Sequence, residues 1–525
     1  MNHIELFAGC GGLSLGLEKA GFNLVLANEL SPMAAETFAY NFFGEDLENY
    51  AVVGRVPESV KWLSSKYDTI DISKRLRENP FQFPGIDEGF SDIDSNIESM
   101  KGKLVVGSIV ELNKLLEKRT SLRMAIRDGY GAGGIDLVSG GPPCQSFSMA
   151  GLRKKDCDKN VLPWEFAKFV KMIKPRFAVL ENVTGILRAF TEGGVRYHAW
   201  FEVAKAFAEI GYVPLCLHVN ARLAGVPQNR PRFLMIGARL DFYRSLRPNL
   251  NDSEKLLFSY GEKFVGKVRK NPESVGLEDL KYFDVLRDKD LDLMKKSFLS
   301  DLVIKNQVSV KDALDDIKFS NPSGKSRFVK SVNREFSFLK KRKEIFNHEP
   351  RNNSDSVRRR FRIYQIIKKC SKATEREALQ VLKGMSSELS ERAWGELREY
   401  RFLLKDGSYK LFRHGEKSNL IEFFHAHTTK KRTQNALDSK LPAPAALSIP
   451  DDACHYDEAE LRTLTVREMA RIQSFPDDFV FRSKVTTGGQ MRRYEVPQYT
   501  QVGNAVPPLL GLAVGNALAN LLIRV

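Results

Sequence analysis

Short apolar runs rich in β-branched and aromatic residues recur along the first 240 positions of the chain. Between several of these runs lie segments whose apolar residues have the spacing of a helix. Residues 13–20 form an apolar helix pattern that Gly21 ends. A second helix is predicted from Pro163, because apolar residues recur there every three or four positions. This alternation predicts an α/β fold with an open sheet, whose carboxyl edge is the usual place for ligands. The predicted strands are residues 3–7, 23–28, 103–106, 135–138, 177–180 and 233–236.

The alternation stops at about residue 241 and resumes at about residue 461. Thr465 and Glu468 have the spacing of a capping box, so a helix is predicted to begin there. An apolar helix over 509–523 follows two prolines that suit a first helical turn, and a basic amphipathic helix is predicted over 356–369. The pattern thus predicts an α/β part over 1–240, in which the mixed-charge stretch at about 44–102 is a surface excursion, a less regular part over 241–460, and a regular part again over 461–525.

The distribution of charge indicates a partner for the less regular part. The formal net charge is +16, and residues 321–440 hold 29 Lys and Arg against 14 Asp and Glu. Such a field favours a polyanion, most simply nucleic acid, although runs of basic residues are usually only solvated faces. The six cysteines show neither a CxxC pair nor a zinc-type spacing, so neither a disulfide framework nor a metal site is expected. Without a membrane-length apolar run or an export signal, we expect a cytoplasmic protein with no membrane partner.

A glycine-rich loop follows the first predicted strand. It consists of Ala8, Gly9, Cys10, Gly11 and Gly12. Glycines let the backbone approach a ligand, and free N–H groups at the start of the next helix point at its polar end, so this arrangement predicts a nucleotide cradle. Glu29 ends the next strand about 20 positions further on, where a carboxylate can accept both ribose hydroxyls. The alternative is that Glu29 is a solvated loop charge.

A stiff turn carries the thiol of Cys144. The turn, 140–143, has two glycines and two prolines and can continue neither a strand nor a helix. Because it follows a predicted buried strand, it presents Cys144 at the carboxyl edge of the sheet. The alternative is that Cys144 is one more small, buried and inert cysteine.

Further polar side chains reach the same edge of the predicted sheet. Strand 177–180 delivers Glu181 there. In the extended segment before the last predicted strand, Gln228, Arg230 and Arg232 share one face. The alternative for these residues is a solvated strand entrance with ordinary surface arginines.

The segment Pro142-Pro143-Cys144-Gln145-Ser146-Phe147-Ser148 resembles the nucleophile block of the DNA cytosine-5 methyltransferases. The other motifs follow that family's order, and the resemblance covers roughly the first 240 and the last 65 residues. It implies the Rossmann-like sheet of S-adenosylmethionine-dependent methyltransferases over 1–240, with a separate, mostly irregular or helical target-recognition domain over 241–460. Residues 461–525 would return to the catalytic domain and close its cofactor pocket.

The resemblance also implies S-adenosyl-L-methionine as the cofactor. Phe7 would lie against the adenine and Glu29 on the ribose. Leu30 and Ser108 stand where the family often has an aromatic residue and an aspartate. The residues expected to bind the cofactor are Phe7, Ala8, Gly9, Cys10, Gly11, Gly12, Glu29, Leu30, Ser108, Ile109, Pro142, Asn504 and Ala505.

Cytosine C5 is a poor nucleophile, so methyl transfer to it requires activation of the ring. By resemblance, the Cys144 thiolate attacks C6 and Glu181 protonates N3, while Arg232, and secondarily Arg230, bind the O2 edge and balance the developing charge. Because these atoms lie inside a duplex, the base must first swing out into the pocket. The residues expected to contact DNA are Gln145, Ser148, Gln228, Arg358, Arg359, Arg360 and Arg362.

The resemblance implies a monomeric bacterial enzyme that methylates cytosine C5 in a specific double-stranded DNA sequence and protects host DNA from a partner restriction endonuclease. A solitary or phage-defence methyltransferase fits the same residues. Two other classes stay open. The basic middle region argues against a transfer-RNA cytosine-5 methyltransferase, and the retained Cys144, Glu181 and glycine loop argue against a non-catalytic DNA-binding relative.

Overall fold

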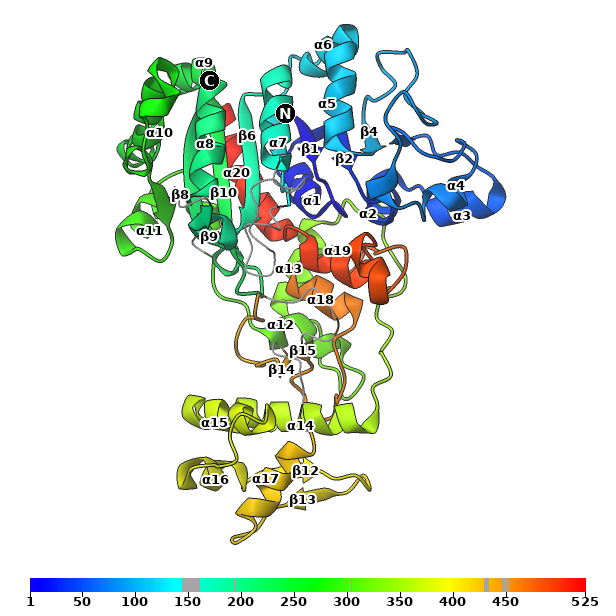
Figure 1. Cartoon of the computed structure of the whole chain (residues 1–525), viewed down its shortest axis with the longest axis vertical. Helices are drawn as coiled ribbons and strands as arrows, with labels where there is room; N and C mark the ends of the chain where they lie inside the picture. The colour runs from blue at the N-terminus through cyan, green and yellow to red at the C-terminus, as the bar shows by residue number, and fades with distance from the viewer. Residues whose placement is uncertain (144–160, 193–194, 304, 429–433, 446–449, 451–452) are drawn as a thin grey trace.

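The architecture was analysed in a computed structural model, which describes residues 1–143, 161–192, 195–303, 305–428, 434–445, 450 and 453–525. In this part of the chain, nine strands form one sheet in the order β11-β9-β10-β6-β5-β1-β2-β4-β3 (Figure 1). Strand β10 runs antiparallel to β6 and β9, and the other neighbours are parallel. The strands are β1 (Asn2–Leu6), β2 (Asn23–Glu29), β3 (Val60–Trp62), β4 (Lys103–Val106), β5 (Leu137–Gly140), β6 (Phe177–Val183), β9 (Tyr212–Asn220), β10 (Pro231–Arg239) and β11 (Tyr282–Asp284).

Helices cover both faces of this sheet. The connections from β1 to β2 and from β5 to β6 run in opposite directions along the sheet, so right-handed crossovers place their helices on opposite faces. The predicted α/β sheet is therefore confirmed, and each predicted strand overlaps an observed one. The helices before residue 240 are α1 (Gly12–Lys19), α2 (Pro32–Phe38), α3 (Leu47–Val53), α4 (Ile72–Arg75), α5 (Ile109–Lys118), α6 (Thr120–Arg127), α7 (Leu162–Ile173) and α8 (Ala199–Glu209).

The two ends of the chain pack together through α1 and α20 (Pro508–Leu522). A Cβ atom on Gly16 would overlap the backbone of α20 at Pro508 and Leu512, and one on Gly515 would overlap Ala20. These glycines therefore let the two helix backbones approach closely. None of the described helices is by itself long and apolar enough to cross a membrane; only the bent pair Gly489–Asn504 and Pro508–Leu522, at 65°, passes that test jointly.

Residues 241–303 belong to the sheet domain, so the boundary expected at residue 240 is wrong. Strand β11 extends the sheet beside β9. Helix α10 (Asp252–Lys270) begins at a capping box of Asn251 and Glu254 and buries Leu257, Phe258 and Phe264 in the same core as the strands. The many polar residues on its exposed face conceal this apolar stripe in the sequence. The other helices here are α9 (Leu240–Leu246) and α11 (Asp288–Lys295).

The insertion at 44–102 is more than the surface excursion expected from the sequence. Strand β3 pairs with β4 and becomes the edge of the main sheet. Trp62, Ile72 and Leu76 are buried in a core shared with β2 and β4. Arg75 forms a buried ion pair with Asp92 at 2.8 Å. The insertion thus forms a packed extension of the sheet domain.

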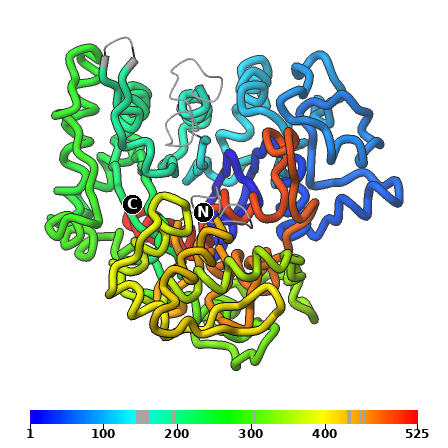
Figure 2. Tube along the Cα trace, turned by 60° about the horizontal axis from the view of Figure 1, so that its bottom comes forward, coloured from blue at the N-terminus to red at the C-terminus, as the bar shows by residue number. Residues whose placement is uncertain are grey.

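Beyond the sheet domain lie two smaller packed regions (Figure 1). The middle region contains α12 (Val310–Leu314), α13 (Arg327–Glu335), α18 (Val466–Ile472) and α19 (Gln498–Asn504). The distal lobe, residues 355–428, 435–436 and 453–461, has its own core, and residues 355–428 come forward in yellow in Figure 2. Its elements are α14 (Asp355–Lys369), α15 (Lys372–Leu382), α16 (Glu391–Leu397), α17 (Lys417–His425), β12 (Arg401–Leu403), β13 (Tyr409–Leu411), β14 (Asn435–Ala436) and β15 (Ala453–Cys454). A separate, mostly helical region is therefore confirmed.

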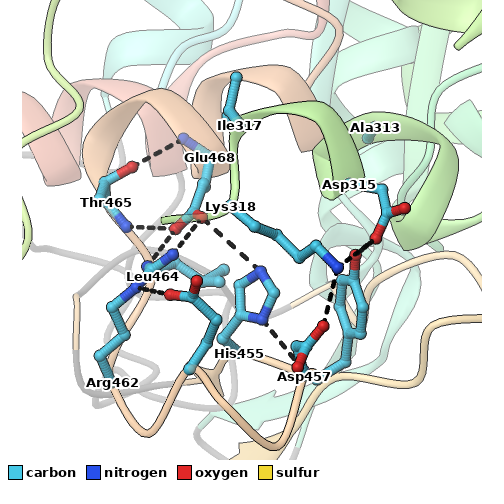
Figure 3. A network of polar contacts seen from close by, with 12 residues as sticks. Ala313, Asp315, Ile317, Lys318, His455, Asp457, Arg462, Leu464, Thr465 and Glu468 are labelled. Atoms are coloured by element: carbon cyan, nitrogen blue, oxygen red, sulfur yellow. Dashed lines mark hydrogen bonds and ion pairs between the residues drawn. The ribbon is translucent and has the colours of Figure 1, made fainter. Parts of the chain in front are cut away.

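A buried polar network joins the distal lobe to the middle region (Figure 3). Glu468 forms the predicted capping box with Thr465 and accepts two hydrogen bonds from Arg462, at 2.7 and 2.8 Å. Burial opposes ionisation of Glu468, but Arg462 lowers its pKa. Lys318 lies between Asp315 (2.9 Å) and Asp457 (2.8 Å). These contacts fix the chain to the middle region where it leaves the lobe, at residues 457–462.

Arg467 organises the turn that follows α18. Its side chain is fully buried. It donates to the carbonyl oxygens of Phe346 (3.0 Å), Pro476 (2.9 Å) and Phe479 (2.5 Å). The turn at Pro476–Phe479 and the segment at Phe346 are thereby tied to one guanidinium group.

The close approach of α1 and α20 gives a stability test. We expect Gly16→Ala to lower the free energy of unfolding by about 1–3 kcal/mol or more, because the added methyl group meets backbone that cannot rotate away. Gly266→Ala in α10 is the control, since a Cβ atom there has no neighbour within 4 Å. This control should be neutral or stabilise by about 0.5–1 kcal/mol. Equal thermal unfolding midpoints for the two variants would contradict the packing argument.

Candidate active site

A cavity of about 520 Å³ lies where β1, β2, β4, β5 and β6 reach their carboxyl ends. This volume is typical of small-ligand and cofactor sites, roughly 300–1,000 Å³. Because β10 is antiparallel, its start lies at the same edge. The predicted residues on the cavity walls are Phe7, Ala8, Gly9, Cys10, Gly12, Glu29, Leu30, Ser108, Ile109, Pro142, Glu181, Arg230, Arg232, Asn504 and Ala505.

The glycine loop turns sharply between β1 and α1. Phe7 and Gly9 both have φ 56, and Gly11 caps α1 with φ 93. Positive φ is easy for glycine but strained for a residue with a side chain, so the surrounding fold must hold Phe7 in this form. Gly11 does not line the cavity; a Cβ atom there would overlap the ring of Phe42. Gly11 therefore allows the sharp turn and does not contact the ligand site.

Glu29 ties the end of β2 to the glycine loop. Its carboxylate accepts the N–H of Gly9 and the N–H of Ser31, each at 2.8 Å. Burial raises the pKa of Glu29, while these N–H donors partly oppose the rise. The carboxylate thus has a fixed place on the cavity wall, and its remaining lone pairs can accept ligand hydroxyl groups.

Glu5 is a cavity residue that the sequence analysis missed. It lies on β1, it is 2% exposed, and the hydroxyl of Ser14 donates to it. Burial, with a smaller effect of Glu29, raises the pKa of Glu5 to about 8. The available signal was a charged residue between Ile4 and Leu6 in a buried strand, because an ion in that position is costly unless a ligand or a proton neutralises it.

The ends of β5 and β6 bring the stiff turn and Glu181 together. The side-chain amide of Asn182 donates to the carbonyl of Pro142 at 2.9 Å. Gly141 leaves room for Glu181, because a Cβ atom there would lie 2.9 Å from the carboxylate. Pro143 also lines the cavity. Cys144, Gln145 and Ser148 lie outside the described residues, so the turn is placed up to Pro143.

Glu181 and Arg232 form an ion pair on the cavity wall. The Nε atom of Arg232 lies 2.6 Å from Oε1 of Glu181, and the side chains are 10% and 12% exposed. The pair is held between adjacent antiparallel strands, since residue 232 is in register with Val183. A carboxyl group and a guanidinium group are therefore presented together beside the turn that leads to Cys144.

Arg230 has a different environment from the one expected. Its Nη2 atom donates to the carbonyl oxygens of Gly503 (2.7 Å) and Ala505 (3.0 Å). Burial and the neighbouring Arg232 lower the pKa of Arg230. Through these carbonyl groups, Arg230 holds the C-terminal wall of the cavity in place.

Gln228 is fully buried, so its predicted contact with DNA is wrong. Its amide donates to the carbonyl of Pro444 at 3.1 Å, and residue 228 forms a parallel bridge with Ala443. The side chains predicted to share one face over residues 228–232 therefore have different partners. Gln228 binds the chain that returns from the distal lobe, and Arg232 binds Glu181.

The arginines of α14 lie in the distal lobe and mostly support it. Arg362 is 6% exposed and pairs with Glu458 at 3.0 Å, so its predicted DNA contact is wrong. Arg359 and Arg360 hydrogen-bond His427, at 3.1 and 3.0 Å. Arg358 is about half exposed, 3.6 Å from Asp355, and retains access to a phosphate.

Comparison with known proteins agrees with this geometry. The family model described as C-5 cytosine-specific DNA methylase matches residues 1–52 and 123–520. The type II methyltransferase M.DdeI of Desulfomicrobium norvegicum is 26% identical over 99% of this chain and 88% of its own length. M1.HphI of Haemophilus parahaemolyticus is 25% identical over 99% and 86%. A crystal structure described as a DNA modification methyltransferase encoded within an E. coli prophage shares the fold, with a TM-score of 0.50, 19% identity and coverage of 100% and 99%.

These findings define a methyltransferase of the S-adenosylmethionine-dependent fold class. The chain belongs to the C-5 cytosine-specific DNA methylase family, and it is a DNA cytosine-5 methyltransferase. The family model skips residues 53–122, which include most of the insertion at 44–102.

The buried carboxyl group of Glu5 gives a pH test. Its pKa is raised, so the folded protein keeps a proton that the unfolded chain has already lost, and stability falls as pH rises from about 5 to about 8. We expect Glu5→Gln to reduce this fall in the thermal unfolding midpoint of the ligand-free protein. An identical pH slope in wild type and variant would contradict the assignment.

Proposed function

We propose that this protein transfers a methyl group from S-adenosyl-L-methionine to C5 of a flipped-out cytosine in a specific double-stranded DNA sequence, through a covalent bond between Cys144 and C6. The observation that carries this proposal is the Glu181–Arg232 pair, 2.6 Å apart on the wall of one cavity with the glycine loop and Pro143. Family membership supports the same reaction.

The cavity residues fit S-adenosylmethionine, which supplies an activated methyl group on a sulfonium sulfur. Phe7, Leu30 and Ile109 offer apolar contact for an adenine, and the Glu29 carboxylate can accept ribose hydroxyl groups. Burial opposes ionisation of the Glu5 and Glu29 carboxyl groups, and a ligand that carries positive charge would favour their ionised forms. A close backbone approach is available at Gly9, where a Cβ atom would have no neighbour within 4 Å.

The proposed mechanism gives each group one step. The Cys144 thiolate adds to C6 of the ring while Glu181 delivers a proton to N3. Arg232 orients the Glu181 carboxyl group and balances charge that develops at the O2 edge. The electron pair placed on C5 then takes the methyl group, which releases S-adenosylhomocysteine. N3 returns its proton to Glu181, and transfer of the C5 proton to solvent re-forms the C5–C6 double bond and expels the thiolate. Because the reacting atoms are paired in a duplex, the base must leave the stack first, which costs a few kcal/mol.

The substrate proposal rests on the basic region as well as on the cavity. Residues 321–440 carry a net positive charge, with 29 Lys and Arg against 14 Asp and Glu. Phosphate contacts by such a region supply binding energy that offsets base flipping. Since curated relatives are type II methyltransferases, we propose that the enzyme acts as a monomer in a bacterial cytoplasm and protects host DNA from a cognate endonuclease. Bisulfite sequencing of DNA from cells that express the chain tests the reaction and reads its target.

We expect Cys144→Ser to lower the rate of methyl transfer by at least about 10³-fold, because a serine hydroxyl is a far weaker nucleophile than a thiolate. Labelled methyl transfer to duplex DNA measures the rate, and binding of cofactor and DNA should stay within about twofold of wild type. Cys370→Ser in the distal lobe is the control. Normal methylation by the Cys144 variant would remove the nucleophile assignment.

Glu181→Gln should lower kcat by about 10²–10⁴-fold, since the amide cannot deliver a proton to N3. Binding of S-adenosylmethionine in the absence of DNA should not change, because the substitution acts on the cytosine. Glu209→Gln, on the exposed face of α8, is the matched control. Unchanged turnover in Glu181→Gln would mean that N3 gains its proton by another route.

A further inference from the structure

The insertion at 44–102 reaches the wall of the cavity. Its short 3-10 turn η2 (Pro80–Gln82) contributes Pro80 and Phe81 to the lining. The same cavity is lined by Leu30, at the end of β2, and by Ile109, after the end of β4. A segment far from the glycine loop in the sequence therefore contributes an aromatic ring, that of Phe81, to a cavity wall otherwise formed at the strand ends.

The turn that carries Phe81 is built as a rigid support. The side chain of Asn79 accepts the N–H of Phe81 (3.1 Å), and its carbonyl accepts the N–H of Gln82 (2.9 Å). Pro80 is buried and fixes the first position of the turn. Just before it, Arg77 pairs with Glu36 of α2 at 3.3 Å.

The far side of the insertion is fixed to the strand ends beside the cavity. Leu63 packs on Gly107, where a Cβ atom would lie 2.7 Å from that of Leu63. The N–H of Ile86 donates to Glu111 of α5 at 3.2 Å. Phe83 packs against the core shared by β2 and β4. Phe81 thus projects from a segment that is anchored on both sides.

The neighbouring walls leave a place for an aromatic contact. The hydroxyl of Ser108 accepts the N–H of Val110 at 3.2 Å as the cap of α5, so Ser108 offers the ligand a small polar group and no ring. Leu30 and Ile109 are aliphatic, and the ring of Phe81 is 54% exposed. A flat nucleoside would cover such a ring and gain stacking and apolar contact that aliphatic side chains give less well.

We infer that the insertion forms the outer wall of the nucleoside end of this cavity and that Phe81 packs against the adenosine part of the bound ligand. The inference deepens the proposed function and rests on it, because it takes the ligand to be S-adenosylmethionine. It assigns to a segment outside the match to the family model a part in cofactor affinity.

The test is the dissociation constant for S-adenosylmethionine, measured by calorimetry on the full chain without DNA. Phe81→Ala should weaken binding by about five- to tenfold, while Phe81→Trp should stay within about twofold. S-adenosylhomocysteine, which has the same nucleoside, should show the same loss. Phe90→Ala is the matched control, because Phe90 lies on the same insertion, is 48% exposed and does not line the cavity.

Each outcome has one meaning. Failure of the wild-type chain to bind S-adenosylmethionine would overturn the proposed function itself. Wild-type binding with an unchanged constant in Phe81→Ala would overturn only the inference about the insertion. A variant with unchanged cofactor binding but a raised KM for DNA would also overturn it, because Phe81 would then act on the nucleic acid. Equal losses in Phe81→Ala and Phe90→Ala would reveal general damage to the insertion and would likewise count against it.

Discussion

The cavity depends on the contact between the two ends of the chain. Helix α20 can lie against α1 because Gly16 and Gly515 carry no side chains at the crossing. This packing places residues 503–505 beside the glycine loop, and Arg230 then binds the carbonyl groups of Gly503 and Ala505. The pocket wall therefore forms only when residues nearly 500 positions apart are in contact, so its geometry reports on the completed fold and not on any local segment.

Much of the sheet and of the site could be predicted from the sequence because both depend on local patterns. Buried strands have apolar runs, and the turn at Pro142 and the capping box at Thr465 need particular residue types at fixed spacings. The pattern failed over 241–303, where β11 is only three residues long and α10 shows a broad polar face. Glu5 was missed because its single charge within β1 has no partner nearby in the sequence; Ser14 becomes its partner only after α1 folds back.

For the basic residues, the sequence could not predict which groups they contact. Sequence gives the number and spacing of arginines, but their partners are set by tertiary structure. From the sequence, Arg362 and Gln228 look like surface residues that could contact DNA, yet both are buried. Arg362 pairs with Glu458, and Gln228 binds the carbonyl of Pro444 on the chain that returns from the distal lobe. Arg232 differs from Arg230 only by two positions on an extended segment, and one binds Glu181 while the other binds backbone. Two arginines of one short motif thus have different roles: Arg232 pairs with a carboxyl group in the cavity, and Arg230 supports the cavity wall.

The polar network at Lys318, His455 and Glu468 bears on how such enzymes diversify. His455 is buried with a pKa lowered by burial, and its Nδ1 accepts the N–H of Asp457, which pairs with Lys318 of the middle region. A lobe that has a core of its own and is held to the rest of the chain by such a network can accumulate substitutions without disturbing the sheet. The lobe can then be replaced as a module, while the chemistry of the pocket is inherited unaltered.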